Sequence, residues 1–251
     1  MDSNISLRKI MFTLMVLLMG VNPLFAHYMW VETKPTGEKG KEHEVRVYFG
    51  EYTYGLLEEV GGESFERMKK FKVWLVAPNG EKEQMTFVPS KEFYVSTFTP
   101  HSDGTYSIIL DNDEIDVLDY TEYDFGIFKT HYHSVAKVAV GSGGSAFVSD
   151  NPSGITIVDL TEGTLKKGGE LSLKVLYKGE PLTDSEISIF IEDQWSKKMW
   201  TDENGQVSLT LPWDKKYIVE VTKKEEVPGE YNGLSYEFIY HCATYYIDGV
   251  K

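Results

Sequence analysis

The chain has 251 residues, a formal net charge of −14 and an aromatic content of 14%. This acidity argues against nucleic acid or an anionic membrane as a partner and is compatible with cations. The single cysteine, Cys242, excludes an internal disulfide, so core packing alone must hold the fold together. Because Cys242 lies in the apolar stretch "YEFIYHCATYYI", we predict that it is a buried structural residue.

Residues 1–26 have the pattern of a cleaved signal peptide. Two basic residues precede an uncharged apolar run at 10–21, which is shorter than the roughly 20 residues that a membrane span needs. Pro23 and the small residue Ala26 then favour cleavage after Ala26. We therefore expect a periplasmic or secreted protein that begins at His27 and has no membrane span in its mature chain.

Short stretches in which apolar and polar residues alternate follow along the chain, and this pattern is typical of half-buried β-strands. The first stretch is residues 43–55. Residues 71–89 contain two more, joined at Asn79-Gly80, which is a strong hairpin signal. Residues 126–141 add a further strand, and only residues 63–72 could form a short helix. The fold is therefore predicted to be all-β.

The composition changes at residues 141–154, where Gly, Ser, Asn and Pro gather and the apolar alternation lapses. Such a change is typical of a linker or a long loop between domains. A second set of strands follows, with a tight turn at Asn204-Gly205. We therefore predict two tandem β-sandwich domains of immunoglobulin-like or prealbumin-like type, at 27–148 and 149–251.

The second half resembles the prealbumin-like and carboxypeptidase-regulatory-like sandwiches. Their pattern is a strand, Gly-x-Pro-Leu, a second strand, Thr-Asp-x-x-Gly and a Leu-Pro ending. The positions that match it are Gly179, Pro181, Leu182, Thr201, Asp202, Gly205, Leu211 and Pro212. Modules of this kind mostly bind or space other parts and seldom catalyse, so the resemblance implies a fold more than a function.

With both halves together, the chain resembles the NikM-like periplasmic proteins. The resemblance covers residues 27 to about 247 and rests on "AHYMWVE", "VRVYFGEYTYG", "FTPHSDGTYSI", "SVAKVAVG" and "GEYNGLSYEFIYHCATYYI", in that order. Proteins of this family are often labelled nickel or cobalt uptake proteins. The resemblance therefore implies nickel or cobalt as cargo, and a membrane transporter or an outer-membrane receptor as partner.

Three histidines form the predicted metal site. His27, as the expected first residue, would offer its α-amine and its imidazole Nδ1 as a chelating pair, and both groups titrate near enough to neutral pH to bind. His131 and His133 are two residues apart in a strand, so both imidazoles can face one ion. Nitrogen ligands of this kind suit Ni, Co, Cu or Zn, and the affinity order favours Cu, so the metal stays open.

The other candidate ligands are assigned to packing or to solvent. His241, in "IYHCAT", is predicted to be a packed core histidine. Residues in more polar surroundings are predicted to be exposed, namely His43, His101, Glu32 and Glu51. Four aromatic residues close in sequence to the predicted site are expected to pack within strands rather than to form a ligand platform: Tyr28, Trp30, Tyr52 and Tyr54.

Common enzyme signatures are missing from the sequence. It has no Gly-x-Ser-x-Gly, no His-Glu-x-x-His and no Gly-rich phosphate loop after a strand, so no catalytic activity is predicted. The leading hypothesis is a protein that binds a divalent transition metal for uptake or delivery. The alternative is a metal-free recognition module that binds protein or glycan through its aromatic strands. A copper-dependent oxidase with a histidine brace would share the N-terminal histidine and little else.

Overall fold

A computed structural model gives the fold of five segments, namely residues 27–141, 151–161, 165, 167–192 and 194–248. The predicted signal peptide and the predicted domain boundary at 148/149 lie outside these residues. Within them, the helical elements are α2 (Glu63–Glu66) and the 3-10 turns η1 (Tyr52–Tyr54) and η2 (Thr121–Tyr123). None of the helices described there is long and apolar enough to cross a membrane. The all-β prediction is confirmed, and the short helix forms over four of its ten expected residues.

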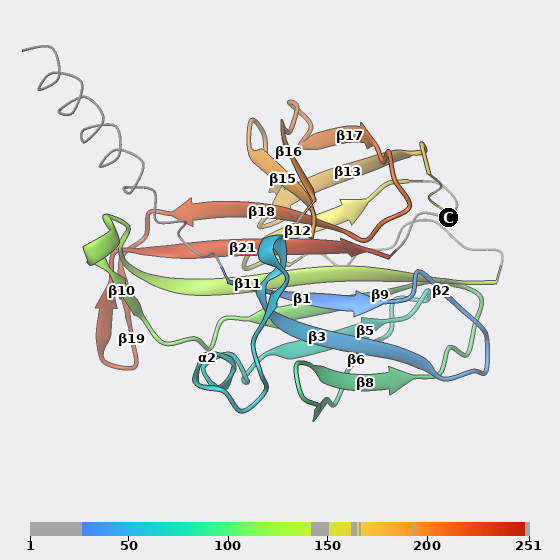
Figure 1. Cartoon of the computed structure of the whole chain (residues 1–251), viewed down its shortest axis with the longest axis horizontal. Coiled ribbons are helices and arrows are strands. Elements are labelled where there is room, and N and C mark those ends of the chain that lie inside the picture. Colours follow the sequence, from blue (N-terminus) through green and yellow to red (C-terminus); the bar gives the residue numbers. More distant parts are fainter. Residues whose placement is uncertain (1–26, 142–150, 162–164, 166, 193, 249–251) are drawn as a thin grey trace, which may run out of the picture.

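A long sheet of ten strands runs through the middle of the molecule (Figure 1). Its main strands lie in the order β16 (Trp195–Trp200), β15 (Glu186–Ile191), β18 (Tyr217–Glu225), β21 (Phe238–Ile247), β11 (Gly126–Val140), β9 (Gly104–Asn112), β5 (Lys72–Val76) and β6 (Lys82–Gln84). The short strands β2 (Thr36–Gly37) and β10 (Leu118–Tyr120) both pair with β11. Strands β11 and β21 run parallel to each other.

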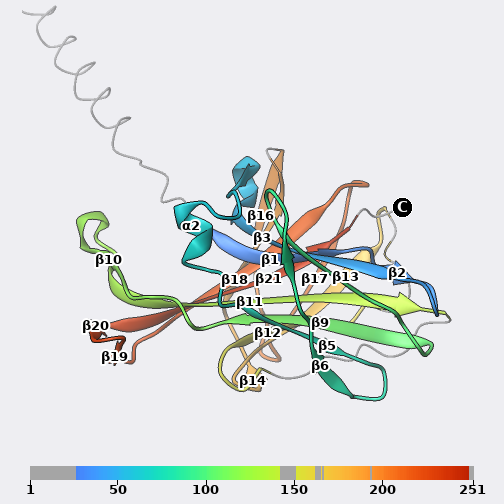
Figure 2. The same ribbon diagram turned by 90° about the horizontal axis from the view of Figure 1, so that it is seen from below.

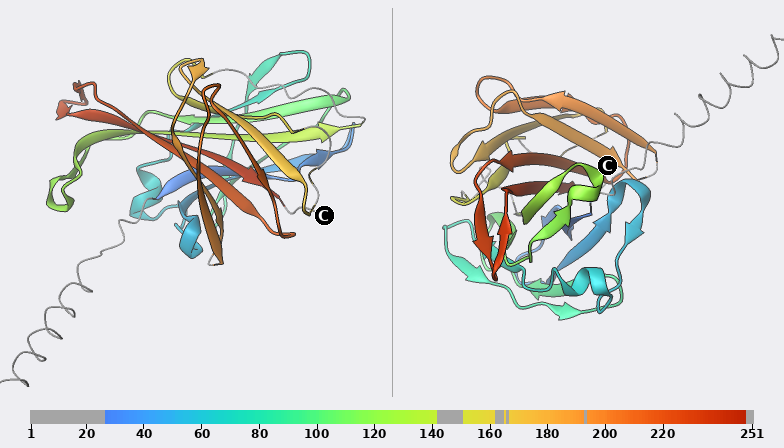
Figure 3. Two further views of the ribbon diagram at one scale, coloured as in Figure 1. Left: turned by 90° about the horizontal axis from the view of Figure 1, so that it is seen from above. Right: turned by 90° about the vertical axis from the view of Figure 1, so that its left-hand side faces the viewer.

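Two smaller sheets cover the two faces of the long sheet, which Figure 3 shows end-on. One consists of β1 (Tyr28–Thr33), β3 (His43–Glu51), β4 (Leu56–Leu57), β7 (Val88–Pro89) and β8 (Tyr94–Phe98). The other consists of β12 (Ile155–Asp159), β13 (Glu170–Tyr177), β14 (Glu180–Pro181) and β17 (Gln206–Thr210). A separate hairpin of β19 (Gly229–Tyr231) and β20 (Leu234–Tyr236) extends at the same end as β10 (Figure 2).

Each face of the long sheet closes its own apolar core. The first core lies against β1 and β3 and includes Val47, Phe49, Ile108 and Val138. The second lies against β12 and β13 and includes Ile157, Leu173, Ile189 and Val219. Successive side chains of a strand point to opposite faces, so neighbouring residues of one strand enter different cores. In β21, for example, Cys242 belongs to the first core and Ala243 to the second.

The two predicted domains share the long sheet. Strands β5, β6, β9 and β11 precede residue 142, whereas β15, β16, β18 and β21 follow residue 150. The β11–β21 ladder therefore joins segments from both sides of the predicted boundary. The sandwich architecture is confirmed, while the limits 27–148 and 149–251 stay a prediction.

The predicted hairpin at Asn79-Gly80 is confirmed. It joins β5 to β6, and Trp74 pairs with Gln84 across it. Gly80 has a φ of 85°, in the left-handed region that favours glycine, so a side chain at this position would strain the turn.

Candidate metal centre

Three buried histidines lie together on the long sheet, on the face that carries the second core. His131 and His133 are two apart in β11, so their side chains point to the same face. His241 comes from the parallel neighbour β21, where the register pairs it with His131. One ligand atom from each histidine lies within 4.8 Å of the others.

The imidazole rings are close enough to act as a unit. The ring centroids of His131 and His133 are 4.0 Å apart, and those of His133 and His241 are 5.4 Å apart with the rings nearly parallel. His133 Nε2 lies 3.1 Å from His241 Nδ1. All three residues are at most 5% exposed, so water does not solvate these nitrogens freely.

Carboxylates hold the outer nitrogens of the cluster. Asp111 Oδ1 lies 2.9 Å from His131 Nε2 and 3.0 Å from His133 Nδ1. Glu225 Oε2 lies 3.1 Å from His241 Nε2. In metal sites, a carboxylate on the far nitrogen commonly fixes the tautomer and orientation of a ligating imidazole. The same arrangement is therefore present here on all three rings.

Counting protons along this network exposes a conflict. The contacts from Asp111 to His133, from His133 to His241 and from His241 to Glu225 are three, but two neutral imidazoles bring only two N–H protons. If the carboxylates receive both, His133 Nε2 and His241 Nδ1 face each other with lone pairs only. A third proton, or a cation between these nitrogens, would resolve the conflict. Placing the His133 proton on Nε2, with Asn151 Nδ2 donating to Nδ1, instead moves it to the 3.0 Å contact between His133 Nδ1 and the Asp111 carboxylate.

Burial works against the third proton. It lowers the pKa of His133 to about 3, although the hydrogen bond with Asp111 opposes this effect. It also lowers the pKa of His241 to about 4, against the opposing effect of Glu225. Desolvation raises the pKa of Asp111, but hydrogen bonds from His131 and His133 outweigh it and leave that pKa well below its usual range. At neutral pH, His133 and His241 are therefore neutral imidazoles beside the ionised carboxylates of Asp111 and Glu225.

Residues 151–154, which form the end of the predicted linker, cover the cluster. Asn151 Nδ2 donates to Asp111 Oδ1 at 2.9 Å and lies equally close to His133 Nδ1. Gly154 lies directly over the His133 ring, and a Cβ built on it would be 2.1 Å from His133 Cε1. The absence of a side chain at 154 therefore allows this segment to approach the ring.

Comparison with known families places the chain. The model of a family described as "Domain of unknown function (DUF4198)" matches residues 24–225. The chain belongs to this family. No curated protein matches it.

Solved structures match this DUF4198 chain at low identity and low TM-score. An Escherichia coli alpha-2-macroglobulin has 9% identity and a TM-score of 0.29, and the match covers 89% of this chain and 20% of that one. The SGBP-B protein of a Bacteroides ovatus mixed-linkage glucan utilization locus has 14% identity and a TM-score of 0.22, with coverages of 86% and 46%. A two-domain fibronectin type-III segment of chicken tenascin has 14% identity and a TM-score of 0.22, with coverages of 87% and 97%.

The DUF4198 chain thus spans about a fifth of the macroglobulin and about half of SGBP-B. TM-scores this low assign neither a ligand nor a partner to it.

His27 lies apart from the other two histidines of the predicted site. Its backbone carbonyl accepts a hydrogen bond of 2.7 Å from Tyr132 Oη, and Tyr132 points to the opposite face of β11 from His131 and His133. Its Nε2 lies 2.8 Å from Glu58 Oε1. The structure therefore brings His131 and His133 together, as expected, but adds His241 in place of His27.

The structure agrees with some of the remaining predictions about burial and differs from others. Cys242, Tyr28, Trp30 and Tyr52 are buried as predicted, whereas Tyr54 is exposed. His101 is exposed as expected.

Three polar residues differ from the prediction that they are exposed. His43 is buried, because its ring packs on Phe98 and its Nε2 lies 2.8 Å from Thr33 Oγ1. Glu51 is buried as well, and it is the last of five consecutive buried residues at the end of β3. Glu32 accepts a hydrogen bond of 3.0 Å from Trp30 Nε1, and its side chain is only 15% exposed.

Sequence reasoning missed three residues of the cluster. His241 is buried, as predicted, but it lies within the cluster because of the parallel register of β11 and β21. Asp111 lies on β9, whose antiparallel register pairs Ile108 with Ala136, and continuing that register brings Asp111 opposite His133. Glu225 ends β18, where it pairs with Ile239. Only the strand order shows that His241, Asp111 and Glu225 lie near His131 and His133. The sequence signal that was available is the alternation around His131 and His133, which could indicate that a neighbouring strand adds further polar residues to the same face.

Proposed function

We propose that this protein binds one divalent first-row transition metal ion through His131, His133 and His241, and that it supports uptake or delivery of that metal outside the cytoplasm. Asp111 and Glu225 would orient the rings from their outer nitrogens. The observation that carries the proposal is the contact between His133 Nε2 and His241 Nδ1, because a cation between them removes the lone-pair conflict.

The spacing of these two nitrogens suits a shared ion. Metal–nitrogen bonds to imidazole are about 2.0–2.1 Å, so two adjacent ligands of one ion lie about 2.9–3.4 Å apart, depending on the geometry. The observed 3.1 Å lies within this range. An ion could therefore bind between these two nitrogens without a large movement of the two rings.

The donor set selects among metals by chemistry. Neutral imidazoles are borderline ligands that suit Ni, Co, Cu and Zn, whereas Mg and Ca prefer oxygen. At equal availability the affinity order favours Cu. Nickel or cobalt as cargo, and a membrane transporter or outer-membrane receptor as partner, are what the resemblance to NikM-like proteins supports.

We assign no catalytic step to the cluster. The three rings are buried beneath residues 151–154, an arrangement that suits retention of an ion more than turnover of a substrate. A metal-free recognition module remains the alternative function.

Calorimetric titration of Cu, Ni, Co and Zn into chelator-treated protein tests the proposal. We expect one tight site per chain in the wild type, in His27→Ala and in the exposed control His101→Ala. His241→Ala should lose that site, because it removes one of three ligands. Unchanged tight binding in His241→Ala, or no tight binding in the wild type, would contradict the proposal, and the second result would favour the recognition module.

A further inference from the structure

A cavity lies on the opposite face of β11 and β21 from the histidine cluster. It has a volume of about 250 Å³ and lies among β3, α2, β10, β11, β18 and β21. The residues of β11 and β21 that line it alternate with the clustered histidines: Phe128, Thr130, Tyr132, Tyr240 and Cys242. The cavity and the metal centre therefore use the same two strands but share no side chain.

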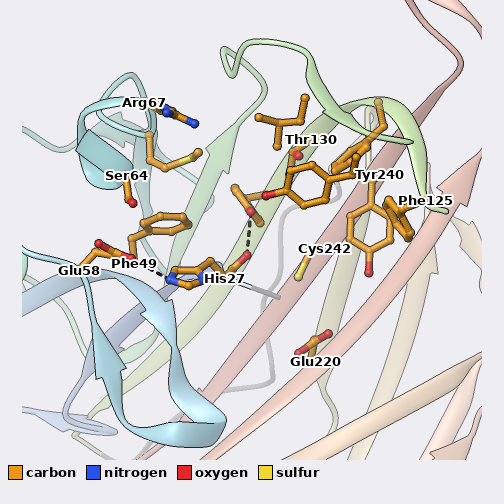
Figure 4. Close-up of a pocket in the computed structure, with 15 residues that line it drawn as sticks. His27, Phe49, Glu58, Ser64, Arg67, Phe125, Thr130, Glu220, Tyr240 and Cys242 are labelled. Carbon is orange, nitrogen blue, oxygen red and sulfur yellow. Dashed lines mark hydrogen bonds and ion pairs between the residues drawn. The ribbon is translucent and has the colours of Figure 1, made fainter. Parts of the chain in front are cut away.

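Aromatic rings form most of its wall. Phe125 packs on Phe128 and Tyr240, with centroids 5.0 Å and 5.4 Å apart. Phe49 contacts Tyr132 at 6.1 Å. Figure 4 shows Phe49 and His27 on one side of the cavity, Phe125 and Tyr240 on the other, and Glu220 beyond Cys242. The negative faces of such rings attract cations.

Among the charged groups in and around the lining, carboxylates outnumber cations. Arg67 forms an ion pair with Glu63, and His27 contacts Glu58 at 2.8 Å. Glu220 has two carboxylates, Glu51 and Glu186, among its electrostatic neighbours, and only one cation, Lys198.

That one cation is already engaged, because Lys198 Nζ lies 2.7 Å from Glu186 Oε1. When Glu220 is ionised, the region around it therefore carries more negative than positive charge, and a bound cation would offset the difference.

A buried hydroxyl provides an independent indication of a ligand. Thr130 is 2% exposed and lines the cavity, and no partner for its Oγ1 exists among the described residues. A buried polar atom without a partner is costly in free energy, so native structures seldom contain one. A ligand with a hydrogen-bonding group beside its charge would satisfy Thr130.

We propose that this cavity binds a small organic cation, of the alkylammonium or quaternary ammonium class, with its charge between the aromatic wall and Glu220. The size of the cavity suits a single small molecule, since ligand sites of drug-sized molecules begin at about 300 Å³. An anion would face Glu220, while Arg67, the one Lys or Arg side chain among the lining residues, already pairs with Glu63. This site does not depend on the metal centre, because the two lie on opposite faces of the sheet.

Titration calorimetry with choline and tetramethylammonium tests the site, with 3,3-dimethylbutan-1-ol as the neutral isostere of choline. We expect saturable binding of both cations and at least about tenfold weaker binding of the isostere, since a desolvated cation–aromatic contact contributes about 2 kcal/mol. Glu220→Gln should weaken choline binding by at least about tenfold, and Tyr240→Leu by a similar factor. The exposed control Glu203→Gln should bind choline like the wild type.

Folding of each variant is checked by circular dichroism and by retention of the tight metal site. Glu220→Gln removes a buried charge and keeps the shape of the side chain, so it tests the charge without opening the core. No saturable binding of either cation at millimolar concentration would overturn the proposal. Equal affinity for choline and its isostere, or an unchanged affinity in Glu220→Gln, would overturn it as well.

Discussion

On one face of β11 and β21, three imidazoles lie against one another with carboxylates on their outer nitrogens. On the other face of the same strands, a cavity near Glu220 is lined by aromatic rings and by the buried Thr130 hydroxyl, which has no partner among the described residues. Both arrangements follow from the alternation of side chains along a strand. A single pair of parallel strands thus carries the two proposed sites, which differ in chemistry.

The two faces also differ in how burial acts on their titratable groups. Burial lowers the pKa of His133 and His241, so the histidine face disfavours protons at neutral pH. Burial raises the pKa of Glu220 to about 7, and the charge of Glu51 adds to this effect. The histidine face therefore disfavours protons, which suits the proposed metal ion, whereas the cavity face favours either a proton on Glu220 or the proposed organic cation.

The largest expected effect concerns the metal ligands themselves. Replacing His133 or His241 by alanine should reduce the affinity for the preferred metal by more than about 100-fold, which exceeds the effect typical of second-sphere changes. His27→Ala should change it less than about threefold, because His27 lies on the other face. Competition with a coloured chelator of known affinity measures all three. A larger loss of metal affinity in His27→Ala than in His241→Ala would contradict the assignment of the metal ligands to the histidine face.

The second effect concerns stability of the metal-free protein below neutral pH. In the unfolded chain, histidines take up protons near pH 6.5, whereas folded His133 and His241 stay neutral to about pH 4 or lower. The unfolded state then binds more protons, so the free energy of unfolding should fall by about 2 kcal/mol per histidine from pH 7 to about pH 5. Urea titrations with a chelator present measure this. His241→Asn should lose its share of the slope, while a flat profile in the wild type would contradict the assignment.

A smaller effect is expected from the carboxylates that orient the rings. Asp111→Asn and Glu225→Gln should each reduce metal affinity by about 10- to 100-fold, because they release the outer nitrogens but remove no nitrogen ligand. The exposed variant Glu203→Gln serves as the matched control. A change in Asp111→Asn as small as in this control would show that the metal is held without that hydrogen bond.

The smallest expected effect is the contribution of Glu220 to stability. It changes with pH in the opposite direction to that of the histidines, so it distinguishes the two faces of the sheet. The pKa of Glu220 is raised to about 7, so the folded protein loses stability as pH rises from the ordinary range of a glutamate to about 7. Glu220→Gln should therefore be more stable than the wild type by about 1–2 kcal/mol at pH 8, with little difference near pH 5. Thermal unfolding at both pH values measures this. Greater stabilisation at the lower pH would contradict the burial of Glu220 as an acid.

Much of the fold could be predicted from the sequence, because it depends on local patterns. Alternation in residues 43–55 indicated β3, and Asn79-Gly80 indicated the hairpin that it forms. The spacing of His131 and His133 correctly placed both rings on one face. These features require only the period of a strand and the conformational freedom of glycine.

The composition of the candidate metal centre could not be predicted in the same way. His241 and Asp111 reach His133 only because β21 and β9 flank β11, and strand order is set by packing of the whole chain. The prediction for His27 relied on its place at the expected start of the mature chain. It did not account for the position of β1, which lies against the opposite face of the long sheet from the His131 side chain, so that the sheet separates His27 from His131.

The most direct test of the account is an anomalous difference map from crystals of the metal-loaded protein, measured at the absorption edge of the bound metal. The account predicts a single strong peak per chain between His133 Nε2 and His241 Nδ1, within bonding distance of His131. A strong peak at His27 and Glu58, with none at the three histidines, would contradict it.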